Sequence, residues 1–249
     1  SAYIACFCMY QLVAKAVPEL KTNKAKVNIQ QSLQLLKQGL PIGITLVLQI
    51  LALATLAFFA SQLGAKAIAA HQIVINIAML IIMTPIAISS ATTIRVAYFS
   101  ATYDHQSKLA TSAAVAVITL IYGVVIAGLL VAFAEPFTGL FSKDAEVLNI
   151  AAGLMSFVAV FLIFDAIQAV ASGVLRGLQQ FMQPLFVILF CYWLVIIPLS
   201  YLMGVRGWFQ ERANVDAIWL VLTCGISLAA ILLVIQSYRY LKKGELPVS

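Results

Sequence analysis

Charged residues are scarce in this sequence. Only 10% of its 249 residues are Asp, Glu, Lys or Arg, whereas 63% are hydrophobic and the mean hydropathy is +1.03. A soluble domain of ordinary composition has about a quarter of its residues charged. The composition therefore excludes a soluble globular domain and predicts an integral membrane protein.

Residues that carry enzyme chemistry are also few, with four cysteines and two histidines in the whole chain. The cysteines all lie in apolar stretches and lack the short spacing of metal sites or the paired loop positions of secreted frameworks. HExxH, GxSxG and glycine-rich nucleotide-binding motifs are missing from the sequence. We therefore predict no metal site, no cofactor and no enzyme activity.

Basic residues exceed acidic ones and give a net charge of +6. Eleven of the fifteen lie in the first linker, the second and fourth loops between apolar stretches, and the C-terminal tail. The positive-inside rule places these segments in the cytoplasm. Loop lysines and arginines indicate contact with anionic lipids and argue against a nucleic-acid surface. The first, third and fifth loops, which lie on the other side of the membrane, hold only Lys66, Lys143, Arg206 and Arg212.

Six apolar stretches exceed the roughly 20 residues that a helix needs to cross a bilayer. Their length, without alternation of polar and apolar residues, favours helices over a β-barrel. The predicted fold is all-α integral membrane, with six complete transmembrane helices and a truncated one. The complete spans are predicted at 40–61, 67–94, 109–134, 147–175, 184–204 and 216–238.

The predicted organisation has four parts. Residues 1–14 are apolar but too short to cross a bilayer, so we interpret them as the end of a truncated transmembrane helix and the chain as a fragment of a longer polypeptide. Residues 15–39 form a cytoplasmic linker with an amphipathic helix, which ends at the break Gly39-Leu40-Pro41. Residues 40–238 form a six-helix lobe, and residues 239–249 form a cytoplasmic tail.

Asp165 is the one carboxylate of nine inside a long apolar run. Holding a charged carboxylate in hydrocarbon costs about 2.5–3.5 kcal/mol on insertion scales. Such a group shares a proton, pairs with a cation or faces a water-filled cavity. A structural alternative is an aspartate that only bonds to a neighbouring helix. We favour ion or proton handling inside the membrane.

Other polar residues inside the predicted spans are candidates for the wall of the same cavity. Gln168 and Ser172 follow Asp165 at i+3 and i+7, so all three share one helix face. Thr45 and Gln49 are spaced i and i+4 on the first span, and Asn76 lies on the second. Interhelical hydrogen bonding is the alternative role for such neutral groups. Arg95 and Arg176, at span ends, are expected to reach lipid headgroups.

Five short segments carry a resemblance to a known family. They are 39–43 (GLPIG), 69–76 (AAHQIVIN), 91–96 (ATTIRV), 165–170 (DAIQAV) and 173–177 (GVLRG). Together they resemble the C-terminal half of NorM-type transporters of the MATE (multidrug and toxic compound extrusion) family, over almost the whole chain.

The resemblance implies that the six spans form one lobe of a twelve-helix MATE-type transporter of the bacterial inner membrane, whose N-terminal six-helix half is missing here. Such antiporters export small cationic or amphipathic drug-like substrates in exchange for H⁺ or Na⁺. Asp165 then matches the carboxylate that couples the ion, with Gln49, Gln168, Asn76 and Thr45 as cavity candidates.

Two departures from the family pattern bear on the coupling ion. Gln49 stands where NorM-like members commonly carry Glu, and Phe161 stands where a Tyr is common. A Na⁺ site needs several oxygen ligands, so these changes favour H⁺. Two alternatives stay open: a flippase of the same superfamily for lipid-linked or oligosaccharide substrates, and a non-transporting membrane scaffold or subunit.

Overall fold

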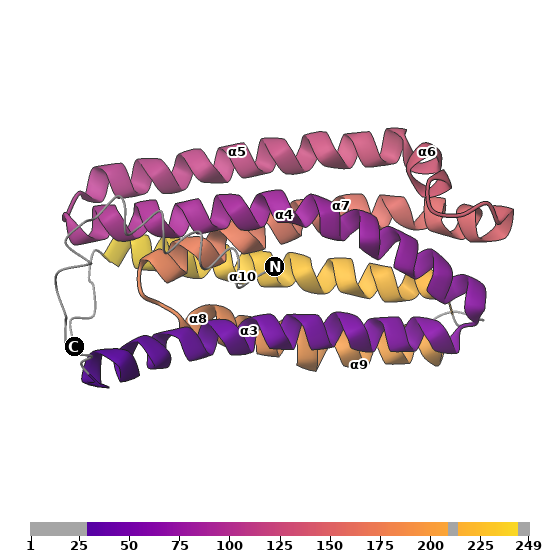
Figure 1. Cartoon of the computed structure of the whole chain (residues 1–249), viewed down its shortest axis with the longest axis horizontal. Coiled ribbons are helices and arrows are strands. Elements are labelled where there is room, and N and C mark those ends of the chain that lie inside the picture. The colour runs from indigo at the N-terminus through magenta and orange to yellow at the C-terminus, as the bar shows by residue number, and fades with distance from the viewer. Residues whose placement is uncertain (1–28, 209–213, 244–249) are drawn as a thin grey trace, which may run out of the picture. The chain divides into compact units, whose positions relative to one another are not determined.

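The computed structural model describes residues 29–208 and 214–243, which contain helices and turns and no strand (Figure 1). The predicted truncated helix at 1–14, residues 15–28 of the predicted linker and the last six residues of the predicted tail lie outside this part. Residues 1–40 and 41–249 form two compact units, and each is described by itself.

The first unit is described only where α3 (Ile29–Gln62) begins. Its apolar residues Ile29, Leu33 and Leu36 are all exposed. The predicted break before Pro41 is wrong, because α3 is one helix that contains Pro41. A proline inside a helix removes one backbone hydrogen bond, and here that loss does not end the helix.

The described residues include six helices long and apolar enough to cross a membrane, as predicted. Each extends past the predicted span at one or both ends, so residues 239–243 of the predicted tail continue the last helix. The short helix α6 (Ala134–Gly139) follows the third span. The spans are α3, α4 (Ala65–Ala101), α5 (His105–Ala132), α7 (Ala145–Gly177), a composite fifth span and α10 (Val215–Lys243).

The fifth span differs most from its predicted form. Between α8 (Met182–Ile188) and α9 (Ile197–Ser200) lies the π-helix η1 (Leu189–Ile196), and a second π-helix, η2 (Tyr201–Val205), ends the span. Pro198, between the two π-helices, lacks the backbone N–H that would continue a regular α-helix. The span is therefore helical throughout but not α-helical throughout.

Polar side chains and one glycine fix where the helices begin. Asp144 accepts hydrogen bonds from the N–H groups of Glu146 and Val147 at the start of α7, and Asp104 accepts one from Ser107 at the start of α5. These carboxylates bond the free N–H groups of a first helical turn. Gly64 turns the chain between α3 and α4 with a φ of 106°, a conformation that glycine adopts without steric cost.

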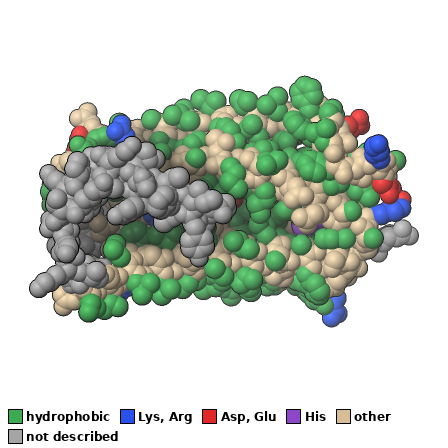
Figure 2. Space-filling model, viewed as in Figure 1, with side chains coloured by type: hydrophobic (Ala, Val, Ile, Leu, Met, Phe, Trp, Pro, Cys, Tyr) green, Lys and Arg blue, Asp and Glu red, His purple; other side chains and the backbone are tan. Residues whose placement is uncertain are grey.

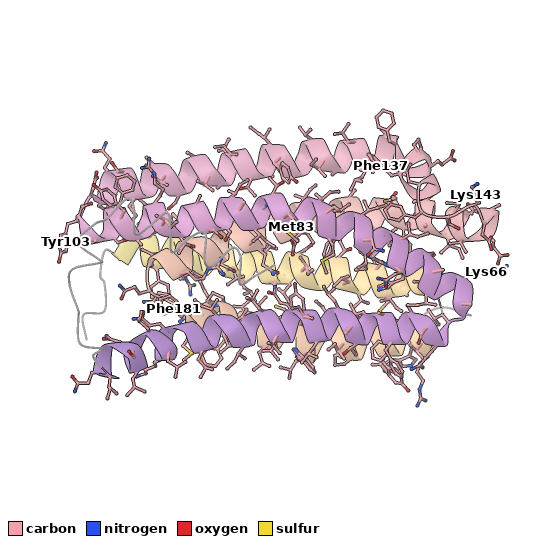
Figure 3. The ribbon with its side chains drawn as sticks, in the orientation of Figure 1. Lys66, Met83, Tyr103, Phe137, Lys143 and Phe181 are labelled. Carbon is pink, nitrogen blue, oxygen red and sulfur yellow. The ribbon has the colours of Figure 1, made fainter. Side chains whose placement is uncertain are left out.

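In the second unit α7 is the central helix and packs against α4, α5 and α10 (Figure 1). α4 bends near Met83, as Figure 3 shows, and Pro85, two residues later inside the same helix, accounts for the bend. Gly173 and Gly177 lie against α4. A Cβ atom on Gly173 would be 2.6 Å from the backbone oxygen of Ser89, and one on Gly177 would be 2.8 Å from that of Thr93.

The surface along the helices is apolar. Figure 2 shows hydrophobic side chains over the length of the visible face, with charged ones towards the ends. On α5, Val117 and Ile121 are 56% and 58% exposed. Lys66 and Lys143 mark one end of the bundle and Tyr103 the other (Figure 3). This distribution is the one expected of helices whose middle parts face hydrocarbon.

Candidate functional site

One face of α7 lines a cavity with a volume of about 170 Å³. Asp165, Gln168, Ser172 and Arg176 all contribute to this wall, because their spacing of 3, 4 and 4 residues keeps them on one helix face. The predicted common face of the first three residues is therefore confirmed. The opposite walls come from α3, α4 and α8, with Ile42, Thr45, Leu46, Gln49, Ile82, Ile86, Ser89, Phe181, Pro184 and Ile188 among the lining residues.

Asp165 is the one carboxylate among the residues that line this cavity. It is half-buried, and it has no ion-pair partner, because the single ion pair among the described residues joins Lys66 and Glu146 at an exposed end of the bundle. Arg176 lies eleven residues further along, about 16 Å away along the helix axis. Asp165 is therefore a carboxylate deep in an apolar bundle whose side chain reaches a cavity.

Gln168 connects the cavity wall to the fifth span. It is 3% exposed, and its Nε2 donates a hydrogen bond to the hydroxyl of Tyr192 over 3.3 Å. Its Oε1 has no hydrogen-bond partner among the described groups. Tyr192 also interacts with Gln49. Gln49 and Gln168 thus line the cavity with Asp165 and give its wall neutral amide groups. The buried Tyr192 interacts with both of them.

Arg176 does not reach out to lipid, contrary to the expectation from its place at a span end. Its Nη2 donates to the hydroxyl of Ser89 over 2.9 Å, and that hydroxyl donates to the backbone oxygen of Ala169. The close approach of α4 at Gly173 brings Ser89 within reach of the guanidinium. Arg176 is therefore a half-buried cation at the cavity wall.

The other two predicted cavity residues lie in different places. Thr45 lines the cavity, and its hydroxyl donates to the backbone oxygen of Pro41 over 2.7 Å. Asn76 is exposed on α4, outside this cavity, so a role for it in the cavity stays a prediction. Phe161 is in the core, edge-on to Trp219 with 5.9 Å between ring centroids.

Sequence reasoning missed Ser89 and Tyr192. Ser89 is a small polar residue among many on its span, and nothing in its spacing pairs it with Arg176. Tyr192 is 3% exposed inside a long apolar run, where a buried phenol requires a hydrogen-bond partner. That requirement was the signal in the sequence, although it could not identify Gln168 as the partner.

Residues 41–202, which include every residue that lines the Asp165 cavity, match the family model described as MatE. The chain belongs to this family. It is 34% identical over 202 residues to the multidrug resistance protein PmpM of Pseudomonas aeruginosa, covering 81% of this chain and 42% of PmpM. It is 31% identical over 230 residues to the probable multidrug resistance protein NorM of Photorhabdus laumondii, covering 92% of this chain and 51% of NorM.

Solved MATE structures show the same fold. A multidrug resistance MATE family transporter of the MOP superfamily, solved in an outward-facing conformation, superposes with a TM-score of 0.80 at 16% identity. The alignment covers 89% of this chain and 49% of that one. The chain thus spans about half the length of the relatives it matches, and its six helices correspond to one lobe of a MATE-type fold.

Proposed function

We propose that this chain is the C-terminal lobe of a MATE-family antiporter that exports small cationic or amphipathic drugs across the bacterial inner membrane. In this proposal a second six-helix half, outside the chain, completes the central cavity. The observation that carries it is Asp165, an unpaired carboxylate that reaches a cavity inside an apolar bundle. The multidrug resistance names of the relatives support the substrate class.

We further propose that the coupling ion is H⁺, bound and released by Asp165. A Na⁺ site needs several oxygen ligands, anionic ones included. The cavity offers one carboxylate, and its other oxygens belong to neutral amides and hydroxyls, among them Gln49 in place of a second acid. A single carboxylate suffices to carry a proton, and this difference favours H⁺ over Na⁺.

Coupling then follows from competition at Asp165. The ionised carboxylate attracts a cationic drug, whereas the protonated form leaves the cavity without that attraction and releases the drug. Binding can only shift the balance between inward- and outward-open states if the ligand binds one state more tightly. In this proposal the proton and the drug compete for Asp165 and favour opposite states, which makes export of the drug depend on entry of the proton.

The test uses the complete transporter, reconstituted in vesicles with an imposed pH gradient or an imposed Na⁺ gradient at clamped pH. We expect the pH gradient to drive export of a cationic dye and Asp165→Asn to reduce export to the level of empty vesicles. Glu135→Gln removes an exposed carboxylate on α6 and is expected to leave export unchanged. Export driven by Na⁺ at clamped pH and abolished by Asp165→Asn would contradict proton coupling.

The flippase alternative is favoured only by the position of Arg176 in the cavity wall, because lipid-linked substrates carry phosphate and require a cationic cavity. The cavity lining has one arginine and one aspartate, hence no net charge when both are ionised. This balance supports amphipathic or cationic substrates better than polyanionic ones. A scaffold role would predict that Asp165→Asn leaves drug resistance of cells expressing the complete protein unchanged.

A further inference from the structure

A second cavity lies on the opposite side of α7. It has a volume of about 340 Å³ and lies between α5, α7 and α10. The α7 residues that line it include Ile167 and Val174, which are two and nine residues after Asp165. At about 100° per residue, both lie roughly half a turn from the Asp165 face. One helix thus separates two cavities of different character.

This second cavity accepts an apolar ligand. No charged side chain lines it. The hydroxyls of Ser112 and Ser237 donate to carbonyl oxygens of their own helices, those of Lys108 and Val234. Their hydrogens are therefore not free to bind a polar ligand. The Thr119 hydroxyl also lines the cavity and is buried without a hydrogen-bond partner among the described groups, so the wall is mostly rather than wholly apolar. Apolar cavities of even about 150 Å³ stay dry and take up apolar molecules, so hydrocarbon is the expected content here.

Two lysines adjoin one end of this cavity. Lys108 precedes the lining residue Leu109, and Lys242 follows Leu241. The ammonium of Lys242 lies 5.9 Å from the ring centroid of Tyr238, which also lines the cavity. Lys108 is only 6% exposed. Two cationic residues therefore adjoin the lining residues at one end of an apolar cavity.

Neither lysine has a carboxylate partner among the described residues, where Lys66 and Glu146 form the single ion pair. The nearest acid in sequence to Lys108 is Asp104, whose carboxylate accepts the N–H of Ser107 at the start of α5. Two lysines next to one end of an apolar cavity favour an anion at that end. An anionic ligand with a hydrocarbon chain satisfies both parts of the site.

The length and position of the cavity match one leaflet of a bilayer. From Lys108 to the lining residue Thr119 is eleven residues, or about 16 Å along α5, close to half of a hydrocarbon core about 30 Å thick. Beside it, Val117 on α5 and Ile231 on α10 are 56% and 52% exposed. The cavity therefore opens among side chains that face hydrocarbon. This outward placement rests on the proposed function, in which the Asp165 face turns to the second half.

We propose that this second cavity is a binding site for one anionic phospholipid, with an acyl chain between α5, α7 and α10 and the phosphate at Lys108 and Lys242. The positive-inside rule assigns both lysines to the cytoplasmic side, where anionic lipids concentrate. Such a lipid would link α5 to α10 on the outer side of α7 and stabilise the lobe while the other face binds and releases its ligands.

The test measures lipid retention by the purified complete transporter with native mass spectrometry. The probes are dioleoyl phosphatidylglycerol, phosphatidylcholine with the same chains, and glycerol 3-phosphate, which has the charged headgroup alone. We expect phosphatidylglycerol to be retained most strongly. Lys108→Gln and Lys242→Gln should each weaken its retention about fivefold, equivalent to about 1 kcal/mol per lysine near a membrane surface. Lys143→Gln, at the other end of the bundle, is the matched control and should have no effect.

A second pair of variants tests whether the lipid lies in the second cavity. Ala116 lines the cavity and is exposed, whereas Ala114 is also exposed on α5 but does not line it. We expect Ala116→Leu to lower retention of both phospholipids and Ala114→Leu to leave retention unchanged. Thermal unfolding of each variant verifies that it is folded.

Several results would overturn the proposal. These are equal retention of the two phospholipids, retention unaffected by the lysine variants, or binding of glycerol 3-phosphate as tight as that of the phospholipid. Equal effects of Ala116→Leu and Ala114→Leu would also refute it. Asp165→Asn is expected to leave lipid retention unchanged, so a failure here is distinguishable from a failure of the proposed transport function.

Discussion

Replacing Gly173 by alanine is expected to force α4 and α7 apart at the point where they approach most closely to the cavity. The added Cβ would be 2.6 Å from the backbone oxygen of Ser89 and 2.6 Å from its hydroxyl. Real Cβ atoms do not approach backbone oxygens so closely, and a backbone oxygen in the middle of a helix cannot move alone. One of the two helices must therefore shift.

A second glycine in the same helix supplies the magnitude. A Cβ on Gly153 would meet nothing within 4 Å. Both changes gain the same helix propensity, about 0.8–1 kcal/mol for glycine to alanine, so this term cancels in their difference. What remains is the cost of overpacking, about 1–3 kcal/mol. Gly173→Ala is thus expected to be less stable than Gly153→Ala by that amount.

The assay is unfolding of the complete protein in mixed detergent micelles by titration with a denaturing detergent, monitored by tryptophan fluorescence. Gly177→Ala, whose Cβ would be 2.8 Å from the Thr93 oxygen, should behave like Gly173→Ala. If Gly173→Ala and Gly153→Ala unfold at the same denaturant concentration, the described contact between α4 and α7 is wrong, and with it the position of Ser89 beside Arg176.

Two further changes test other contacts. Trp193→Phe removes the indole N–H that donates to the Leu48 backbone oxygen over 3.3 Å, and it should lower the free energy of unfolding by about 1 kcal/mol; a stability equal to wild type would contradict this bond. Asp104→Ala removes the carboxylate that caps α5, where the hydrogen bond from Ser107 lowers the pKa of Asp104 below 3.8. A lowered folded pKa means that the stabilisation is present above the unfolded pKa and is lost as the pH falls through the folded value. The difference in melting temperature between Asp104→Ala and wild type should therefore shrink as the pH falls from 6 to below 3.8, and a constant difference would refute the link to this carboxylate.

The number and placement of the six spans could be predicted from the sequence, because each is a continuous apolar run and polar residues separate one run from the next. The shared face of Asp165, Gln168 and Ser172 was predictable for a similar reason, since helical spacing fixes which residues lie on one side. These are local properties. They depend on the chain near each residue and not on which helix lies opposite.

The remaining features depend on tertiary contacts. Whether Pro41 ends a helix or lies inside one depends on what surrounds it, and here α3 continues through it. The partner of Arg176 was not predictable, because Ser89 is 87 residues away in sequence. Gly173 and Gly177 have the spacing of small residues that let helices pack closely in membranes, but the spacing alone does not identify the partner helix. Only the structure shows that α4 of the same chain occupies that face.

The π-helical fifth span has a mechanical consequence. Tyr192 and Trp193 are neighbours in η1, yet the first bonds to Gln168 of α7 and the second to the backbone of α3 at Leu48. Two successive side chains thus hydrogen-bond to two different helices that line the Asp165 cavity. If α3 slides past α7, one of these two hydrogen bonds has to stretch or break. The fifth span therefore couples the movements of the two helices.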